Sequence, residues 1–440
     1  MRPVLIALAA ATFLSGCGIL GGRSEPKGTP TVGERIPVLS GEAGVEVDPE
    51  LAEIPVVLPA PVENAEWAQG GGTASKSVGH VALGGSLTPA WSVSIGQGSS
   101  TNARLGSAPV VGEGRIYTMD TQAVVRALDP QNGTTVWQRQ LTSPQASART
   151  LFGGGVSYAA GRVYAVNGAG DAAAIDAATG AIVWQVRPGG PLRGNPTIAG
   201  DTVYVVSQDN QLFALNTADG TQRWAVSGSA EASGVFGAAS PAFGQSTVVA
   251  GYSSGELTAY RYENGQEVWS DALTRTTVTT QVHALSDIDA DPVIDQGRVY
   301  AIGSGGRMVA LEINTGQRLW ELNIAGTGNP WVAGDWIYVI TDTAQLLAIA
   351  RTTGRIRWMS QLQRWREPDD RRGTITWRGP VLAGGRLVLV NTLGQIVFAS
   401  PQDGSVQQTI DTRTPISLSP IVAGSTLYIL DDRGRLTAYR

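Results

Sequence analysis

The chain has 440 residues, of which 56 are glycine and only 16% are charged, and its formal net charge is −5. Proteins that bind nucleic acid usually carry a basic stripe, so this charge balance argues against a nucleic-acid partner. Cys17 is the single cysteine, so the chain contains no cysteine pair.

The N-terminus has the pattern of a secretory signal. Arg2 is followed by an apolar run over residues 4–14, which is too short to span a bilayer but suits a signal peptide. Residues 14–17, Leu-Ser-Gly-Cys, resemble the bacterial lipobox, in which the cysteine becomes the first mature residue and carries lipid. We therefore expect a signal peptide over residues 1–16 and a lipidated Cys17. The glycine at position 18 implies sorting to the outer membrane, with the protein facing the periplasm.

A stretch without strand pattern follows the signal. Residues 18–64 are rich in Gly, Pro and Glu, a composition typical of flexible linkers. We expect residues 17–66 to form a lipidated N-terminus and a flexible tether, with a random-coil reach of about 35–40 Å. The folded domain is then expected over residues 67–440.

One sequence frame returns eight times within residues 67–440. A Pro, replaced by Val156 in the second copy, is followed eight positions later by Tyr or Val, then by Gly sixteen positions further on and by Trp four after that; the first copy is Pro109, Tyr117, Gly133 and Trp137. Each copy contains short apolar runs separated by Gly and Asn turns, which is typical of four antiparallel strands. Repeats of about 45 residues built this way indicate a stacked or closed β array.

The last repeat indicates how the array ends. The eighth copy stops at Arg440 before its Trp strand, and residues 87–91, which end with Trp91, can supply the missing strand. Completion of the last repeat by the first strand closes a ring, whereas an open solenoid needs caps at both ends. We predict an all-β fold, an eight-bladed β-propeller of four-stranded antiparallel blades, with the open solenoid as the alternative.

The Trp residues of the frame have a regular small neighbour. Ala stands ten positions after the Tyr or Val in seven copies, and Phe398 takes that place in the seventh, which also has Gln408 at the Trp position. A small residue leaves room for the Trp of a neighbouring sheet. We therefore expect these Trp residues to belong to the core and not to a ligand-stacking platform.

The repeat resembles a known family. The segments Ala127-Leu-Asp129 with Gly133 and Trp137, and Ala310-Leu-Glu312 with Gly316 and Trp320, resemble the pyrroloquinoline-quinone (PQQ) propeller repeat. Quinoprotein dehydrogenases and the BamB lipoproteins of the outer-membrane β-barrel assembly machinery share this repeat. The lipobox, the eight copies and the length favour the BamB family. That resemblance implies a periplasmic scaffold anchored to the outer membrane. It implies binding to POTRA domains of BamA and to other Bam subunits, help in inserting β-barrel proteins, and no catalysis or cofactor. Contact with unfolded outer-membrane proteins stays open.

A PQQ-dependent periplasmic dehydrogenase is the alternative function. Such enzymes commonly have a disulfide between adjacent cysteines, Ca²⁺ ligands and an Asp base, and this chain lacks the cysteine pair. Asp287, Asp289 and Asp291 have the alternate spacing of a calcium loop, but Pro292 stands where such a loop needs Gly. We therefore expect no catalytic, cofactor-binding or metal-binding residues.

The variable parts of the repeat point to a binding face. The connection from each Trp to the next Pro varies from 10 to 23 positions, while the rest of the frame is constant. In four-stranded antiparallel blades these connections all emerge on one face. Variable loops on a rigid scaffold are where binding tends to reside.

Two of these loops resemble partner-contact elements of the BamB family. Leu192 and Arg193 match a Leu-Arg-Gly element, and Asp287 and Asp289 match a Ser-Asp-x-Asp element. The resemblance implies that these four residues bind BamA, with an apolar anchor, an Arg and two carboxylates as a hot spot. The alternative is that Arg193 and Asp287 brace their own loops. The third loop contains Trp365 among residues of mixed charge, and these charges indicate a loop that extends into solvent. The alternative is that Trp365 anchors a partner.

Overall fold

The computed structural model describes residues 45–141, 150–229, 239–274 and 287–440. The expected signal peptide and Cys17 therefore lie outside the described residues, and their roles stay predictions. Within these ranges the fold is built from 34 strands and one short helix, α1 (Pro49–Ala52). In the described part of the chain, no helix has the length and hydropathy needed to cross a membrane.

Eight four-stranded antiparallel sheets form the blades, and their strands follow one another from the ring axis outwards. Blade 1 consists of β2 (Val110–Gly112), β3 (Arg115–Met119), β4 (Val124–Leu128) and β5 (Thr135–Gln140), and blade 2 of β6 (Gly154–Ala159), β7 (Arg162–Asn167), β8 (Ala172–Asp176) and β9 (Ile182–Val186). Blade 3 consists of β10 (Leu192–Ala199), β11 (Thr202–Ser207), β12 (Gln211–Asn216) and β13 (Gln222–Ser227), and blade 4 of β14 (Ala242–Gly244), β15 (Thr247–Gly251), β16 (Glu256–Arg261) and β17 (Glu267–Ala272).

The second half of the ring repeats this order. Blade 5 consists of β18 (Val293–Asp295), β19 (Arg298–Ile302), β20 (Met308–Glu312) and β21 (Arg318–Leu322), and blade 6 of β22 (Trp331–Ala333), β23 (Trp336–Ile340), β24 (Gln345–Ala350) and β25 (Ile356–Gln361). Blade 7 consists of β28 (Trp377–Ala383), β29 (Arg386–Asn391), β30 (Gln395–Ala399) and β31 (Val406–Asp411), and blade 8 of β32 (Ile421–Ala423), β33 (Thr426–Leu430), β34 (Arg435–Tyr439) and β1 (Pro89–Ser94). A separate hairpin, β26 (Trp365–Glu367) and β27 (Arg372–Thr374), stands between blades 6 and 7.

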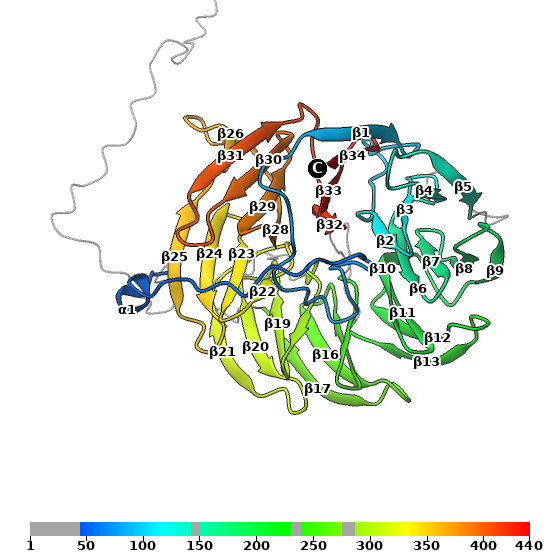
Figure 1. The fold of residues 1–440 in the computed structure, drawn as a ribbon. Helices are drawn as coiled ribbons and strands as arrows, with labels where there is room; N and C mark the ends of the chain where they lie inside the picture. Colours follow the sequence, from blue (N-terminus) through cyan, green and yellow to red (C-terminus); the bar gives the residue numbers. More distant parts are fainter. Residues whose placement is uncertain (1–44, 142–149, 230–238, 275–286) are drawn as a thin grey trace, which may run out of the picture. The chain divides into compact units, whose positions relative to one another are not determined.

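The ring closes as the sequence predicts. β1 pairs antiparallel with β34, with Trp91 opposite Ala438, and Figure 1 shows these two strands side by side. Thr88 and Arg440 exchange backbone hydrogen bonds of 2.9 and 3.0 Å. The eight-bladed propeller is therefore confirmed, and the open solenoid is excluded.

The packing of the Trp residues differs in one respect from the prediction. The Ala of the frame lies opposite the Trp of its own sheet, as Ala348 lies opposite Trp358. The neighbouring blade instead presents its Gly, because a Cβ on Gly404 would lie 2.5 Å from the Trp358 ring. Each indole N–H also donates to a carbonyl of the next blade's last turn. These donors are Trp91, Trp137, Trp184, Trp224, Trp269, Trp320 and Trp358. The Trp residues are thus core, as expected, and they join consecutive blades.

Ring closure explains the exception in blade 7. Blade 8 has no turn between its third and fourth strands, because its fourth strand is β1 and does not follow β34 in the chain. A Trp in blade 7 would therefore find no Gly-containing turn to pack against. Gln408 stands there instead, opposite the fully buried Phe398, and the Arg386 guanidinium lies 4.6 Å from the Phe398 ring centroid.

Residues 45–88, which we call the strap, run over one face of the ring before β1 begins (Figure 1). Trp67 exchanges backbone hydrogen bonds with Val111 of blade 1, and further bonds join the strap to blades 4, 5 and 7. At its start, Val47 forms a parallel bridge with Ile356, the first residue of β25. Residues 45–66 therefore differ from the expected flexible tether, because their backbone is bonded to the blades.

The strap also crosses the ring axis and has its own buried contacts. Trp67, which is bonded to blade 1, stacks on Trp331 of blade 6 with ring centroids 6.0 Å apart. The Lys76 side chain is only 3% exposed, and its Nζ donates to Thr197 Oγ1 of blade 3 at 3.0 Å. Burial lowers the Lys76 pKa to about 8, although the nearby Asp291 acts in the opposite direction. The strap is thus an integral part of the domain.

Candidate partner-binding face

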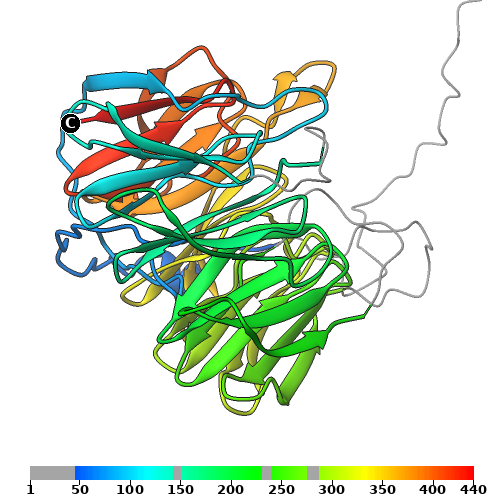
Figure 2. The same cartoon turned by 90° about the vertical axis from the view of Figure 1, so that its right-hand side faces the viewer.

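The propeller has two different faces, which the topology defines. The loop face carries the connections between blades and the turns from second to third strand. The strap face carries the turns from first to second and from third to fourth strand, together with the strap. Figure 2 shows the ring edge-on, with the strap on one side and the β26–β27 hairpin on the other.

Both predicted partner elements lie on the loop face. Leu192 opens β10 and pairs with Ser207, the last residue of the second strand. The carbonyl oxygen of Asp287 accepts a hydrogen bond from the N–H of Ser304, which follows the second strand of blade 5. Both elements therefore stand at the same end of their blades, two blades apart in the ring.

Leu192 is fully buried and belongs to the core between blades 2 and 3. Its side chain is therefore not the exposed apolar anchor that the sequence suggested. It fixes the start of β10, and thereby the position of the Arg193 backbone.

Arg193 is half-buried and already has partners in its own chain. Its guanidinium donates to the Phe152 carbonyl oxygen at 3.2 Å and to Gln208 Oε1 at 2.9 Å, and it lies 5.4 Å from the centroid of the Phe152 ring. Burial lowers the pKa of Arg193. Arg193 therefore braces its own loop, which was the alternative given by the sequence. The same contacts hold the guanidinium in a defined place on the loop face.

The second element is anchored by the residue between its two carboxylates. Ile288 is 2% exposed and packs against Gly251, where a Cβ would lie 2.5 Å from the Ile288 side chain. Asp287 is 3% exposed, so little of its side chain reaches the surface. Asp289 is half-buried and is the more accessible carboxylate of the pair.

The charge of Asp289 is tuned by its surroundings. Burial and the nearby Asp287 raise the pKa of Asp289 to about 6, and Arg378 acts in the opposite direction. Arg378 comes from β28 in blade 7, and its Nε donates to the Ser417 carbonyl oxygen at 3.1 Å. Arg378 also interacts electrostatically with Asp432 of blade 8, so charged residues from blades 5, 7 and 8 form one group.

Arg378 is a residue that the sequence reading missed, and it is the structural equivalent of Arg193. Both Arg residues precede a Gly with positive φ and stand just before a register shift in an unusually long innermost strand. Each pairs with the residue two positions after the Tyr or Val of the frame, Val206 for Arg193 and Val390 for Arg378. Both blades have an Arg-Gly pair shortly before the Pro of the frame, and this pair was a sequence signal by which Arg378 could be identified.

The third acidic residue of the calcium-like spacing has a structural partner. Asp291 accepts hydrogen bonds from the Ser240 N–H at 2.6 Å and from Asn329 Nδ2 at 3.0 Å. It therefore links the innermost strands of blades 4, 5 and 6. Across the described ranges, no three His, Cys, Asp or Glu side chains gather closely enough to hold a metal ion.

The third predicted loop contains the β26–β27 hairpin. Trp365 is half-buried, with the Arg364 guanidinium 4.8 Å from its ring centroid. Arg366 donates to the Thr392 carbonyl oxygen at 2.6 Å. The hairpin is therefore fastened to blade 7, and both roles of Trp365 stay predictions.

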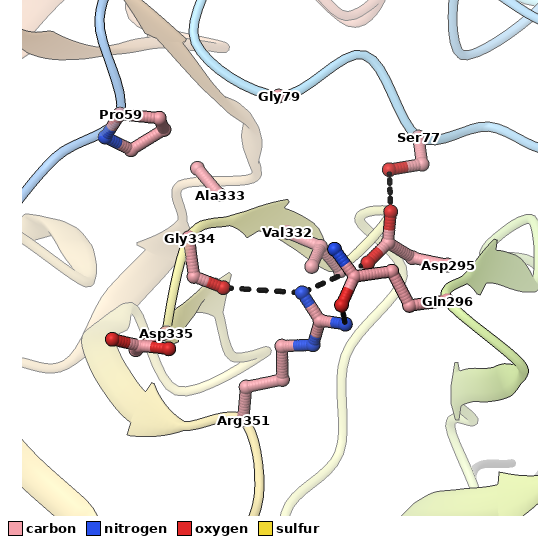
Figure 3. Close-up of a pocket in the computed structure, with 10 residues that line it drawn as sticks. All are labelled: Pro59, Ser77, Gly79, Asp295, Gln296, Val332, Ala333, Gly334, Asp335 and Arg351. Carbon is pink, nitrogen blue, oxygen red and sulfur yellow. Dashed lines mark hydrogen bonds and ion pairs between the residues drawn. The ribbon is translucent and has the colours of Figure 1, made fainter.

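A cavity of about 300 Å³ lies on the opposite, strap face (Figure 3). Arg351 lies at its base and donates to Gln296 Oε1 at 2.6 Å and to the Gly334 carbonyl oxygen at 3.2 Å. It also forms an ion pair with Asp295 at 2.9 Å, and Asp295 accepts a hydrogen bond from Ser77 of the strap at 2.9 Å. Arg351 and Asp295 are paired, and Ser77 donates to Asp295, so this part of the cavity joins the strap to blades 5 and 6.

Fold and repeat together define the class of the protein, which is an eight-bladed propeller of PQQ-like repeats. The sequence profile described as outer membrane protein assembly factor BamB matches residues 73–150 and 121–360. The chain belongs to this family.

Individual relatives agree. The outer membrane protein assembly factor BamB of Yersinia pestis is 26% identical over 363 residues, covering 80% of this chain and 89% of the relative. That of Escherichia coli K12 is 27% identical over 387 residues, covering 78% and 86%. That of Vibrio cholerae is 37% identical over 253 residues, covering 57% and 64%.

Solved structures confirm the fold. BamB from Moraxella catarrhalis matches with a TM-score of 0.67 at 20% identity, covering 81% of this chain and all of that one. Quinohemoprotein alcohol dehydrogenase from Comamonas testosteroni matches with a TM-score of 0.67 at 14% identity, covering 85% and 80%. At these identities the likeness concerns the fold alone and does not separate an assembly factor from an enzyme.

Proposed function

We propose that this chain is a scaffold subunit of the outer-membrane β-barrel assembly complex. Family membership is the observation that carries the proposal, since the relatives that cover most of the chain are named outer membrane protein assembly factors. In this role the chain binds other subunits of the complex and assists the insertion of β-barrel proteins. It performs no catalysis.

The proposal includes a place in the cell. Cys17 carries the lipid, and residues between Cys17 and the strap connect the propeller to the periplasmic side of the outer membrane. The support is the lipobox-like run at residues 14–17 and the apolar stretch before it. Several acyl chains on one residue give stable anchoring.

The partner on the loop face is a POTRA domain of BamA. Arg193 and Asp289 are the contact residues, since each is partly exposed on that face. Leu192 and Asp287 act beneath them, because both are buried and fix the two loops. An Arg and a carboxylate two blades apart suit an extended partner with complementary charges.

A charge reversal tests this proposal. Purified BamA POTRA domains are titrated with the full chain carrying Arg193→Glu, and with Arg261→Glu as a matched control. Arg261 is exposed at the end of β16, on the strap face. We expect Arg193→Glu to cost about 2 kcal/mol or more, roughly 30-fold in Kd, and the control to be neutral. Equal affinities for both variants would refute the site, provided that both keep the wild-type melting temperature.

A quinone-dependent dehydrogenase is the competing function, and it is separable by a direct measurement. The purified chain is incubated with pyrroloquinoline quinone and Ca²⁺, and the absorbance of bound cofactor is recorded after gel filtration. We expect no cofactor to elute with the protein. A stoichiometric cofactor spectrum would favour the enzyme.

A further inference from the structure

The strap presents a row of apolar side chains to solvent, on the face opposite the proposed BamA site. Ile54, Val57 and Val62 are 46%, 71% and 65% exposed, and Pro55, Pro59, Ala60 and Pro61 between them are exposed as well. Single exposed apolar residues are ordinary, but several exposed apolar residues close together on one segment mark an interaction surface. We call residues 53–63 the strap strip.

From Pro55 onwards the strap strip contains no helix or turn, and its backbone is held in place. Proline fixes its own φ, and it also keeps the residue before it out of the helical region, so the prolines at 55, 59 and 61 restrict six positions in all. The backbone is fastened to the blades: Gln402 of blade 7 accepts a hydrogen bond from the Val56 N–H and donates to the Val56 carbonyl oxygen. His80 Nδ1 lies 2.7 Å from the Pro59 carbonyl oxygen. A rigid, extended ligand loses little conformational entropy when it binds.

The strap strip itself carries only negative charges, although Arg357 of blade 6 donates to its Ile54 carbonyl oxygen, and these charges indicate the kind of partner. Residues 45–66 include six acidic residues and no Lys or Arg. Asp48 and Glu50 form ion pairs with Arg355, whereas Glu53 and Glu63 are exposed and pair with no cation among the described residues. These two carboxylates therefore stand at the two ends of the apolar row, available to a cationic partner. An anionic lipid surface attracts basic segments and would repel this one.

We propose that the strap strip is a preformed docking element for a periplasmic protein domain with an apolar groove flanked by Lys or Arg. Ile54, Val57 and Val62 enter the groove, and Glu53 and Glu63 meet the flanking cations. Extended proline-containing segments are recognised in this way because their backbone is ordered before binding. The proposal goes beyond the BamA contact, because the two surfaces lie on opposite faces and the scaffold can then hold two proteins at once.

Photo-crosslinking in cells tests the proposal. The full chain carries p-benzoylphenylalanine at position 57 in one variant and at position 406 in the control. Val406 is an apolar residue 52% exposed on the outer strand of blade 7. We expect one discrete protein adduct from position 57 and none of that size from position 406. The adduct should fall at least fivefold when Glu53→Lys and Glu63→Lys are added, and it should be unchanged by Arg193→Glu.

Identification of the adduct decides the outcome. Mass spectrometry locates the crosslinked residue, and the purified partner is then titrated with wild type and with Val57→Asp. An attachment point in an apolar groove flanked by Lys or Arg, with Kd raised at least tenfold by Val57→Asp, supports the proposal. An adduct to lipid alone, an adduct within the same chain, or no adduct would overturn it. So would a partner without such a groove. Because Val57 is exposed, Val57→Asp should keep the wild-type melting temperature, and this is measured alongside.

Discussion

Trp358 of blade 6 packs directly against Gly404 of blade 7, and its indole N–H donates to the Pro401 carbonyl oxygen at 3.0 Å. The same contact pair recurs around the ring. It explains why the frame keeps Gly and Trp at a constant spacing: the Gly permits the turn and seats the Trp of the preceding blade.

The first prediction concerns this seam. Gly404 and Gly385 belong to the same blade and have φ values of +73° and +74°. A Cβ on Gly385 would meet no atom within 4 Å, whereas a Cβ on Gly404 would strike the Trp358 ring. Both alanine variants pay about 1–2 kcal/mol for the left-handed backbone, and Gly404→Ala should lose a further 1–3 kcal/mol or so to overpacking. Urea unfolding measures both, and equal losses would contradict the seating role of Gly404.

The second prediction concerns the strap. Trp67 is 3% exposed and stacks on Trp331, so Trp67→Ala should lower the free energy of unfolding by about 3–5 kcal/mol. Trp365 of the hairpin is half-buried, and Trp365→Ala should cost less than about 1 kcal/mol because it lies away from the core. If residues 45–88 were a loose tether, Trp67→Ala would cost no more than Trp365→Ala.

The third prediction is a pH dependence from Lys76. Its pKa is about 8 in the folded protein, against an ordinary value of 10.5. Between these values the unfolded chain binds more protons at Lys76 than the folded protein does, so stability rises with pH across that window. The slope is about 1.4 kcal/mol per pH unit. Lys76→Met removes this slope and leaves the titration of other groups in place. Parallel slopes for wild type and Lys76→Met between pH 8 and 9.5 would show that Lys76 is not buried as described.

The fourth prediction concerns the loop face. Asp289 has a pKa of about 6, so its carboxylate gains a proton as the pH falls through 6. If that charge meets a cationic group of the POTRA domain, Kd should rise several-fold between pH 7 and pH 5.5. Asp289→Asn should bind more weakly at pH 7 and show a smaller change with pH, as isothermal titration calorimetry can measure. An unchanged pH response in Asp289→Asn would remove Asp289 from the contact.

Much of the ring was predictable from sequence, because each blade is a local unit. Alternating apolar runs and Gly turns specify four strands within about 45 residues, and a truncated last copy specifies closure. The sequence shows Gln408 at the Trp position of the seventh copy. The reason for this exception lies in the fold, because blade 7 is followed by the blade that β1 completes. The strap was hidden because the buried partners of Val56, Trp67 and Val81 lie far away in the chain.

The candidate site was predictable in position but not in chemistry. The constant frame places residues 192–193 and 287–289 at the same end of their blades, and the structure agrees. The burial of these residues could not be predicted, because it depends on how neighbouring blades pack against them. Leu192 fills a gap between two sheets, and no local pattern distinguishes that from an exposed anchor.

The most direct measurement for the loop face is hydrogen–deuterium exchange of the full chain with and without BamA POTRA domains. We predict slower exchange in peptides that cover residues 192–195 and 287–291, and no change in peptides that cover the strap strip. Protection confined to the strap face, or no protection at either loop, would contradict the account.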